Sequence, residues 1–354
     1  MFENFSFDSF ETRNAMIVKW ELYGAPEKSW LQLCYVIVLD TVSILSLVAY
    51  GMVFYLHLTD KSGTFSQSFY KLTISLSFGD AMVLLTNTVY LSQLYSQWEK
   101  YLHPAYIHVV GFLGDVAFWW INGHTIVISL NRLLATLQVD MVKDCFDGCR
   151  LVLWLAACYL LAVFVPASKW YCGCYLHAPT GWGWEFTCGD YKTTCRDLVM
   201  RIGQFLDYFV VGILIAVHLI IFNRVRVLSQ IDLSAMGDLQ RHIMSRKIAK
   251  SQRDLSMAVQ FLLISILLAV HMIAFWIVTA LVPAKKLAPE IGMVILNGTL
   301  VLNSAINPFM YLLVCRQARR ALFSKLLQST VDGHKLFICR VPPKIVDWGI
   351  QSTI

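Results

Sequence analysis

Charged residues are scarce in this chain. Asp, Glu, Lys and Arg make up only 15% of its 354 residues, whereas 57% are hydrophobic and the mean hydropathy is +0.58. A soluble domain carries far more charge on its surface, so the composition excludes one and indicates a membrane protein with several spans. Nothing in the sequence suggests a nucleic acid as partner.

The first residues do not have the pattern of a cleaved signal peptide. The run MFENFSFDSFETRN has neither the basic start nor the apolar core of a cleaved signal peptide. We therefore expect the first apolar span to act as its own insertion signal.

Seven windows are long and apolar enough to cross a bilayer, which takes about 20 mostly apolar residues per helix. They lie near residues 31–58, 69–94, 105–137, 151–168, 198–222, 255–281 and 289–314. The sequence thus predicts an all-α membrane protein whose domain, residues 31–314, is a seven-transmembrane helix bundle. It is flanked by an extracellular tail at 1–30 and a cytoplasmic segment at 315–354, where the run 316–323 predicts a short amphipathic helix on the inner membrane surface.

Positive charge is unevenly distributed along the chain. With charges at span ends counted in the adjacent loop, the odd-numbered turns and the C-terminal segment hold 19 Lys or Arg and 9 Asp or Glu. The N-terminal tail and the even-numbered turns hold 9 and 10. Excess Lys and Arg marks the cytoplasmic side, so we expect the N-terminus outside. The positive face would also attract anionic membrane lipids and suit an acidic partner.

The seventh span ends in the run Asn307-Pro308-Phe309-Met310-Tyr311. A proline inside a membrane helix leaves one carbonyl without its partner, so a neighbouring helix, a polar side chain or water must satisfy that carbonyl. Polar residues recur in this span at steps of three, four or seven residues and form one stripe: Asn297, Asn303, Ser304, Asn307 and Tyr311. Such stripes normally face the bundle interior.

Polar residues also share one face of the third span, because they follow one another at steps of three or four. They are Asp115, Trp119, Asn122, Thr125, Ser129 and Arg132. Asp80, near the middle of the second span, needs a partner, a bound cation or a proton at that depth. Oxygens of Asn303 and Asn307 could complete a site there, so a sodium ion, a hydrated polar site and a protonated structural acid all stay open.

The outer half of the bundle offers a candidate ligand site. Such sites are largely apolar and aromatic with a few placed polar groups. The candidates are Asp115 and Trp119 of the third span, Asp207 and Tyr208 of the fifth, and Trp276 of the sixth. The two acids stand out because burying a carboxylate is costly. Arg201 either joins this set or pairs with Asp197, one turn earlier.

Four of the ten cysteines crowd the turn between the fourth and fifth spans: Cys172, Cys174, Cys188 and Cys195. On the outer, oxidising side we expect disulfides in preference to a zinc site, and three pairings remain open. The run Asn4-Phe5-Ser6 in the N-terminal tail is a glycosylation acceptor.

These residues resemble the rhodopsin-like G-protein-coupled receptors. The matches are Asp80, Asn131-Arg132, Trp154, Pro166 and Asn303-Ser304-x-x-Asn307-Pro308-x-x-Tyr311. The loop from Cys174 to Cys195 and the run Ser129-Leu130-Asn131-Arg132-Leu133 look like nematode chemosensory serpentine receptors, especially the Srx class. The resemblance implies a plasma-membrane receptor that couples an extracellular small-molecule ligand to a heterotrimeric G protein. It assigns activation and coupling to Asn131, Arg132, Asn307, Pro308 and Tyr311.

The sequence departs from that family at several positions. Asn131 replaces the acid before the arginine, which leaves less to hold the arginine in a resting state. Ile107 stands where the family has a cysteine, so the outer loop is expected to close on itself. Val301 replaces the lysine that binds retinal in opsins, so we expect no retinal and no other cofactor. Asp115 lies one residue beyond the aspartate of amine receptors, which disfavours an amine ligand.

A seven-span transporter or ligand-gated channel is the alternative function. Transporters usually carry paired repeats with broken helices at matching positions, which this sequence lacks. An insect-type odorant channel would have the opposite topology. A membrane hydrolase is disfavoured because there is no His-Glu-x-x-His and no nucleophile, base and orienter at one depth, so we expect no enzymatic activity.

Overall fold

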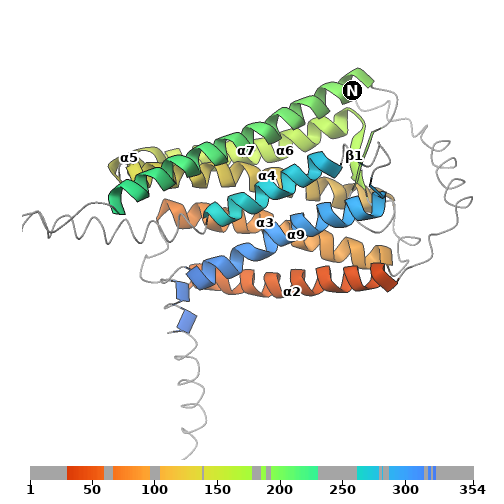
Figure 1. Ribbon diagram of the computed structural model, residues 1–354, viewed down its shortest axis with the longest axis horizontal. Coiled ribbons are helices and arrows are strands. Elements are labelled where there is room, and N and C mark those ends of the chain that lie inside the picture. Colours follow the sequence, from red (N-terminus) through yellow and green to blue (C-terminus); the bar gives the residue numbers. More distant parts are fainter. Residues whose placement is uncertain are drawn as a thin grey trace, which may run out of the picture.

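The computed structural model contains seven long helices among its described residues (Figure 1). Those residues are 30–59, 67–95, 104–137, 139–177, 185–188, 193–229, 261–278, 281, 287–314, 318–319 and 322–323. The long helices are α2 (Trp30–Leu58), α3 (Ser68–Tyr95), α4 (Pro104–Leu137), α6 (Cys149–Tyr171), α7 (Thr193–Ser229), Phe261–Val278 and α9 (Pro289–Val314). The predicted seven-helix bundle is confirmed.

The predicted spans agree with the helices except at two places. The helix α6 continues to Tyr171, beyond the predicted end at residue 168, and therefore includes Lys169. The helix α7 begins at Thr193 and ends at Ser229, well outside the predicted 198–222. Both extensions contain charged residues, Lys169 in α6 and Arg196, Asp197, Arg224 and Arg226 in α7, which a search for apolar windows leaves out.

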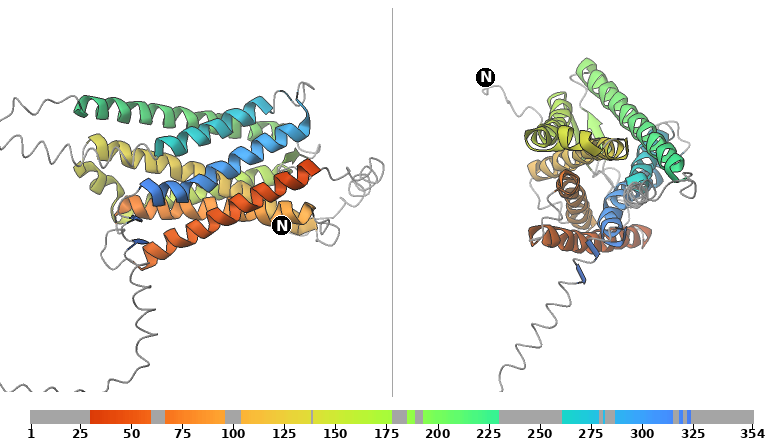
Figure 2. Two further views of the ribbon diagram at one scale, coloured as in Figure 1. Left: turned by 60° about the horizontal axis from the view of Figure 1, so that its bottom comes forward. Right: turned by 90° about the vertical axis from the view of Figure 1, so that its left-hand side faces the viewer.

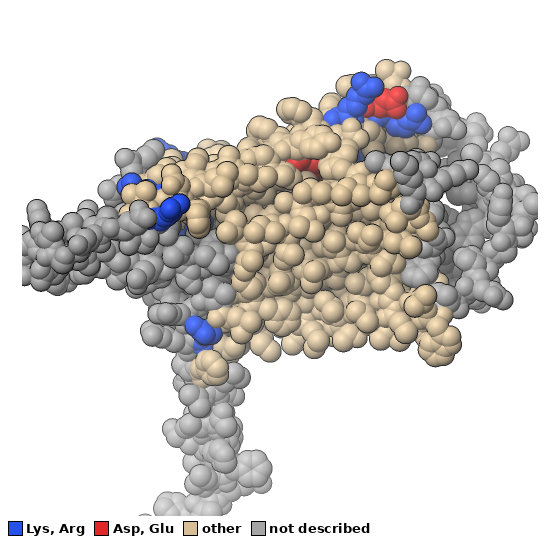
Figure 3. Space-filling model, viewed as in Figure 1, with Lys and Arg blue, Asp and Glu red and all other residues tan. Residues whose placement is uncertain are grey.

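The outer surface of the bundle is apolar and its interior is partly polar. In α2, Ser43 and Ser46 are 0% exposed, whereas Ile44 and Leu45 are 53% and 58% exposed. Five helices (α2, α6, α7, Phe261–Val278 and α9) contain a span that is long and apolar enough to cross a membrane by length and composition. The face drawn in Figure 3 is accordingly almost entirely tan between its two ends. This inverted polarity is that of a protein surrounded by lipid, and it fits a multi-pass membrane protein.

The helix α4 lies at the centre of the bundle. It packs against α3, α6 and α7 and against the strand β1, whereas α2 packs against α3 and α9 (Figures 1 and 2). Because α4 contacts most of the other elements, the polar face predicted for the third span lies inside the bundle, where side chains from several helices can reach it.

The turn between α6 and α7 contains a small hairpin that the sequence did not predict, although the bundle itself is all-α as predicted. The strands β1 (Cys174–His177) and β2 (Glu185–Cys188) form an antiparallel pair in which Cys174 lies opposite Cys188. The hairpin and the first residues of α2 lie at the same end of the bundle, hereafter the outer end (Figure 1).

The opposite, inner end is built partly from a short helix that the sequence did not predict, α5 (Val139–Phe146). The ring of Phe146 stacks on Trp154 with a centroid distance of 5.7 Å, and the indole Nε1 of Trp154 donates to the carbonyl of Cys145 at 3.2 Å. The guanidinium of Arg150 donates to the carbonyl of Asp144. Trp154, one of the residues that carried the family resemblance, thus holds α5 against α6.

Residues beyond α9 fit an amphipathic segment where the structure describes them. Ala318 is fully buried against the core, whereas Arg319 is exposed and Phe323 is 62% exposed. The glycosylation candidate Asn4 lies outside the described residues.

Candidate functional site

The polar face of α4 is buried along its whole length, as the helical spacing predicts. Asn122 and Thr125 are 0% exposed, Ser129 is 1% exposed, and Asp115 and Arg132 at the two ends are each 6% exposed. Polar groups that face inward at membrane depth need partners from other helices or bound water. Three such groups of residues lie in the middle of the bundle, at its inner end and at its outer end.

The first group, the polar core, consists of Asp80 on α3 and Asn303, Ser304 and Asn307 on α9. The amide Nδ2 of Asn307 donates to Oδ2 of Asp80 at 2.7 Å. Within the described part of the chain, no hydrogen-bond partner exists for Asp80 Oδ1, either amide atom of Asn303, Ser304 Oγ or Asn307 Oδ1. Several buried oxygens on facing helices therefore fit a water molecule or a hard cation such as sodium.

The proline of α9 is accommodated by a neighbouring helix. Pro308 has no N–H to give to the carbonyl four residues earlier, which is that of Ser304. The hydroxyl of Tyr50, on α2, donates to this carbonyl at 2.9 Å. Tyr50 is 1% exposed, so no bulk water reaches the site to do the same. The helix α9 thus continues through Pro308, and at this point it depends on one side chain of α2.

A narrow crevice runs from the polar core toward the inner end. It is lined by Asp80, Asn307, Pro308 and Tyr311 together with apolar residues that include Phe261. The residues of the Asn-Pro-x-x-Tyr run therefore share one internal space with Asp80.

The second group, the inner aromatic cluster, surrounds Arg132 and Tyr311. The guanidinium carbon of Arg132 lies 3.2 Å from the ring centroid of Phe69 on α3. The same ring meets Phe261, in the helix Phe261–Val278, edge-on at 5.4 Å. Tyr311 contacts Tyr70 edge-on at 6.4 Å. Asn131, which replaces the expected acid, is 1% exposed. An aromatic face can hold a cation, and Phe69 does so for the guanidinium of Arg132.

The third group, the outer charge cluster, consists of Asp115 on α4, Lys169 on α6 and Asp207 on α7. The ammonium of Lys169 donates to both carboxylate oxygens of Asp115, at 3.0 and 3.1 Å. It also lies 5.5 Å from the ring centroid of Trp119. Asp207 is 9% exposed and lies within electrostatic range of Lys169 and Asp115, but its Oδ1 has no hydrogen-bond partner among the described residues.

The other predicted ligand residues lie only partly in the outer charge cluster. Tyr208 is 60% exposed, although it is the neighbour of Asp207, and its ring stacks on Trp276 at 4.7 Å. Arg201 is exposed, and Asp197 pairs with Arg196 at 3.0 Å, so the suggested pairing of Arg201 with Asp197 is wrong. The structure brings Asp115, Trp119 and Asp207 toward one cluster and places Tyr208 and Trp276 together beside α7.

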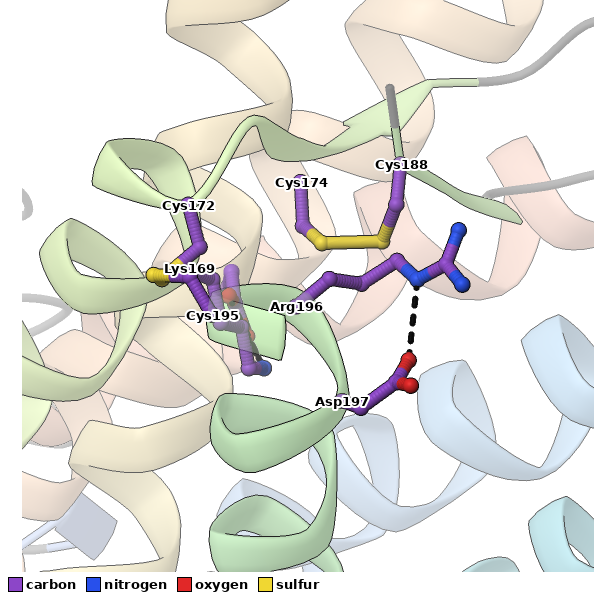
Figure 4. Close-up of a disulfide and its surroundings, with 8 residues drawn as sticks. Lys169, Cys172, Cys174, Cys188, Cys195, Arg196 and Asp197 are labelled. Carbon is purple, nitrogen blue, oxygen red and sulfur yellow. Dashed lines mark hydrogen bonds and ion pairs between the residues drawn. A yellow bond between two sulfur atoms is a disulfide. The ribbon is translucent and has the colours of Figure 1, made fainter. Parts of the chain in front are cut away.

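Two disulfides close the loop above this cluster (Figure 4). Cys172 at the end of α6 is joined to Cys195 near the start of α7, and Cys174 is joined to Cys188 across the hairpin. The pairing that the sequence left open is thereby decided, and the loop closes on itself as expected. Among the described residues, no group of three or more His, Cys, Asp or Glu is placed to hold a metal ion.

Several residues of these groups were missed by the sequence analysis, and Lys169 and Phe69 are the most important of them. Lys169 was counted in the outer turn because the predicted span ends at residue 168. The need of Asp115 for a counter-ion could have pointed to it, since few cations lie near the outer ends of the spans. Phe69 carries no comparable signal, because one more aromatic residue in an apolar span is ordinary.

Comparison with known protein families identifies the family of this chain. Residues 41–306 match the family described as serpentine type 7TM GPCR chemoreceptor Srx. The chain belongs to this Srx family. Its fold and family are thus those of receptors and not of enzymes, which agrees with the resemblance seen in the sequence.

Among solved structures, squid rhodopsin is similar, with a TM-score of 0.66 over 89% of this chain and 89% of that one. The two sequences are 20% identical, so this likeness supports the seven-helix fold alone. No curated protein matches the chain. The Srx receptor described here therefore has the rhodopsin-type bundle, while its ligand and its coupling have to be argued from its own residues.

Proposed function

We propose that this Srx receptor is a chemosensory receptor of the plasma membrane, which passes the binding of an extracellular small molecule to a heterotrimeric G protein. The observation that carries the proposal is the position of Arg132. It ends a continuous buried polar face of α4 and lies in the same inner cluster as Phe261 and the core around Tyr311. A movement of the helices at the inner end would change what Arg132 contacts.

The mechanism is a shift between two arrangements of the bundle. A ligand that prefers one arrangement moves the equilibrium toward it. In the resting arrangement Phe69 covers Arg132, and its ring also packs edge-on with Phe261. Outward movement of the helix Phe261–Val278 removes one wall of this cluster, which exposes Arg132 and Tyr311 to the G protein. Pro308 supplies a place in α9 where the backbone ladder is already interrupted.

The polar core is proposed to hold a sodium ion or water, through Asp80 and the oxygens of Asn303, Ser304 and Asn307. A bound cation would neutralise Asp80 and link α3 to α9. The check is the melting temperature of the purified receptor in sodium chloride and in choline chloride. A sodium-specific increase that Asp80→Asn removes is the expected result, and equal melting temperatures in the two salts would argue for water or a proton instead.

The coupling itself is tested with the receptor at the cell surface and a panel of volatile and water-soluble compounds. We expect at least one compound to activate a G protein in cells with the natural receptor and to do so at least tenfold less with Arg132→Ala. The matched control is Arg224→Ala, which changes an exposed arginine near the inner end of α7. A surface-expressed receptor that gives no Arg132-dependent response to any compound would contradict the proposal.

A further inference from the structure

Among the described residues, few polar side chains face the lipid, and exposed hydroxyl groups are satisfied by their own helix. Thr41 on α2 donates to the carbonyl of Ile37, and Ser168 on α6 donates to that of Phe164, each at 2.7 Å. Such a side chain needs no partner from outside the protein. An exposed polar group without a bond of this kind has to find its partner in the membrane or at its surface.

Two exposed polar side chains of α7 are of this second kind. Arg201 and Gln204 are exposed and form no hydrogen bond or ion pair with a described residue. The acid one turn before Arg201, Asp197, is paired with Arg196 at 3.0 Å. Asp207 is buried, so it lies on a different face of the helix from Arg201. The described part of the protein therefore provides no counter-ion for Arg201.

Arg201 lies at the depth of the lipid headgroups. The exposed Arg224, near the inner end of the same helix, is 23 residues further along, which is about 35 Å of α-helix. A hydrocarbon core is about 30 Å thick, and tilt reduces the distance that a helix covers along the membrane normal. Arg201 is therefore placed just beyond one edge of the core, beside the phosphates of the leaflet at the outer end.

The side chains that follow Arg201 match the successive layers of a glycerophospholipid. Gln204 lies about 4.5 Å deeper along the helix, toward the level of the glycerol esters. Phe205 and Tyr208 are 66% and 60% exposed and, four and seven residues after Arg201, share its face of the helix. The ring of Tyr208 stacks on Trp276 at 4.7 Å, which adds the neighbouring helix to this surface. A cation, an amide and aromatic rings thus follow one another from the headgroup level inward.

From this order we propose that these five residues, hereafter the α7 lipid surface, bind one glycerophospholipid of the leaflet at the outer end. The guanidinium of Arg201 binds the phosphate, the amide of Gln204 donates to an ester carbonyl, and an acyl chain lies against Tyr208 and Trp276. Arginine suits a phosphate because its planar group can donate two parallel hydrogen bonds. The proposal concerns the lipid-facing side of the receptor and depends on neither a signalling ligand nor a G protein.

The chemistry of the surface separates a phospholipid from other occupants. A sterol or a diacylglycerol offers no phosphate to Arg201, and a free phosphate offers no hydrocarbon chain to the rings. A second copy of the receptor, joined through the same face by two-fold symmetry, would bring two arginines without counter-ions into one contact. A phospholipid meets the cation, the amide and the rings together.

The test is native mass spectrometry of the purified full-length receptor with three lipids of identical chain length. They are dioleoylphosphatidylcholine, dioleoylglycerol, which lacks the phosphate, and the dioleyl ether of phosphatidylcholine, which lacks the ester carbonyls. We expect phosphatidylcholine to bind about tenfold more tightly than dioleoylglycerol, the effect of one hydrogen bond to a charged group. It should bind about threefold more tightly than the ether lipid, the effect of one neutral hydrogen bond.

Variants then assign each preference to its residue. Arg201→Gln should remove the preference for phosphate and keep the preference for esters, whereas Gln204→Leu should do the reverse. Arg196→Gln is the matched control, since this arginine is at the same end of α7 but is paired with Asp197, and both preferences should remain. Each preference is a ratio measured on one folded variant, so a loss of stability does not imitate it. Gln204→Leu also tests the surface by itself if Arg201→Gln does not fold.

Several results would overturn the proposal. Dioleoylglycerol could bind as tightly as phosphatidylcholine, or both preferences could persist in both variants, which would leave Arg201 as an arginine in contact with bulk headgroups. Displacement of the lipid by an equal concentration of glycerol 3-phosphate would make a free phosphate the ligand. A receptor dimer that excludes the lipid and is lost in Arg201→Gln would make this face a contact between copies. None of these results bears on coupling through Arg132.

Discussion

Several buried polar residues of this receptor are held by a partner on another helix. Asp80 accepts a hydrogen bond from Asn307, and the backbone carbonyl of Ser304 accepts one from the hydroxyl of Tyr50. Ser75 shares a hydrogen bond of 2.8 Å with His124. Between membrane helices such bonds contribute about 0.6–2 kcal/mol each, and packing supplies the rest of the association. Each residue therefore fixes a relation between two helices, and a change at one residue can shift how two helices sit together.

Phe69 is the residue whose removal should be most visible in signalling. We expect Phe69→Ala to raise G-protein activation in the absence of ligand, because the guanidinium of Arg132 loses the ring that covers it. A buried cation–π contact contributes roughly 0.5–2 kcal/mol, which corresponds to about a two- to thirtyfold change in the equilibrium between resting and active forms.

The control for this prediction keeps the ring. Phe69→Tyr retains an aromatic face, so its basal activity should stay near that of the natural receptor at equal surface expression. If Phe69→Ala instead lowered basal activity, or if both variants behaved alike, Phe69 would be a packing residue without a role in the resting state.

At the residue scale, sequence reasoning found the polar residues and one pairing, that of Asp80 with Asn307, but it missed most of the other partners. Asp80, Asp115, Asn307 and Arg132 were recognised because polar groups at membrane depth are rare and costly. Helical periodicity also placed them on the correct faces. Which side chain meets which depends on how the helices pack, and that is set by many apolar contacts with no individual signal. Lys169 is the clearest example, since it lies beyond the apolar window that defined its helix.

At the element scale, α9 is the helix with a built-in interruption. Its hydrogen-bond ladder lacks one donor at Pro308, and the hydroxyl of Tyr50 satisfies the carbonyl of Ser304 in its place. The polar core begins at the same point, with Asn307 bound to Asp80 at 2.7 Å. A helix that depends on two neighbours at one level can change its shape there when those neighbours move.

The dependence of α9 on Tyr50 can be measured as a double-mutant cycle. Tyr50→Phe leaves the buried carbonyl of Ser304 without a donor and should lower the free energy of unfolding by about 1–2 kcal/mol. In the Pro308→Ala background, residue 308 has its own N–H for that carbonyl, so Tyr50→Phe should cost much less. Thermal unfolding of the four purified receptors gives the coupling energy.

The cycle has a control at the start of the same helix. Pro289→Ala changes a proline at the first helical position, where a missing N–H leaves no intrahelical bond unmade. The cost of Tyr50→Phe should therefore be the same in that background as in the natural receptor. A cost that is equal in the Pro308→Ala background as well would mean that Tyr50 does not compensate for Pro308.

Helix boundaries followed from the sequence wherever a helix ends with its apolar stretch, as α2 and α9 do. They did not where a helix continues into polar residues, as α6 and α7 do. The short helix α5 and the hairpin β1–β2 were not predicted either. Their stability comes from tertiary contacts, namely the stacking of Phe146 on Trp154 and the disulfide between Cys174 and Cys188, and not from a periodic pattern.

For the whole molecule, the arrangement of polarity is the organising feature. Exposed apolar residues cover the lipid-facing surface, buried polar residues run through the centre, and the disulfides stand at one end. Disulfides form on the oxidising side of a membrane, whereas excess Lys and Arg collects on the cytoplasmic side. In this receptor the two indicators point to opposite ends, as one orientation requires. We therefore expect the N-terminal tail outside and the basic turn at 223–253 inside.

This orientation separates a receptor from an odorant-gated channel of opposite topology, and it can be tested on intact cells. An epitope tag at the N-terminus should be stained without permeabilisation, whereas a tag inserted in the turn at 223–253 should be stained only after it. Maleimide labelling gives an independent measure, because Cys172, Cys174, Cys188 and Cys195 should resist it from outside until a reductant is added. Staining of the inner tag on intact cells would place the inner aromatic cluster outside, where Arg132 could not meet a G protein, and the receptor mechanism would fail with it.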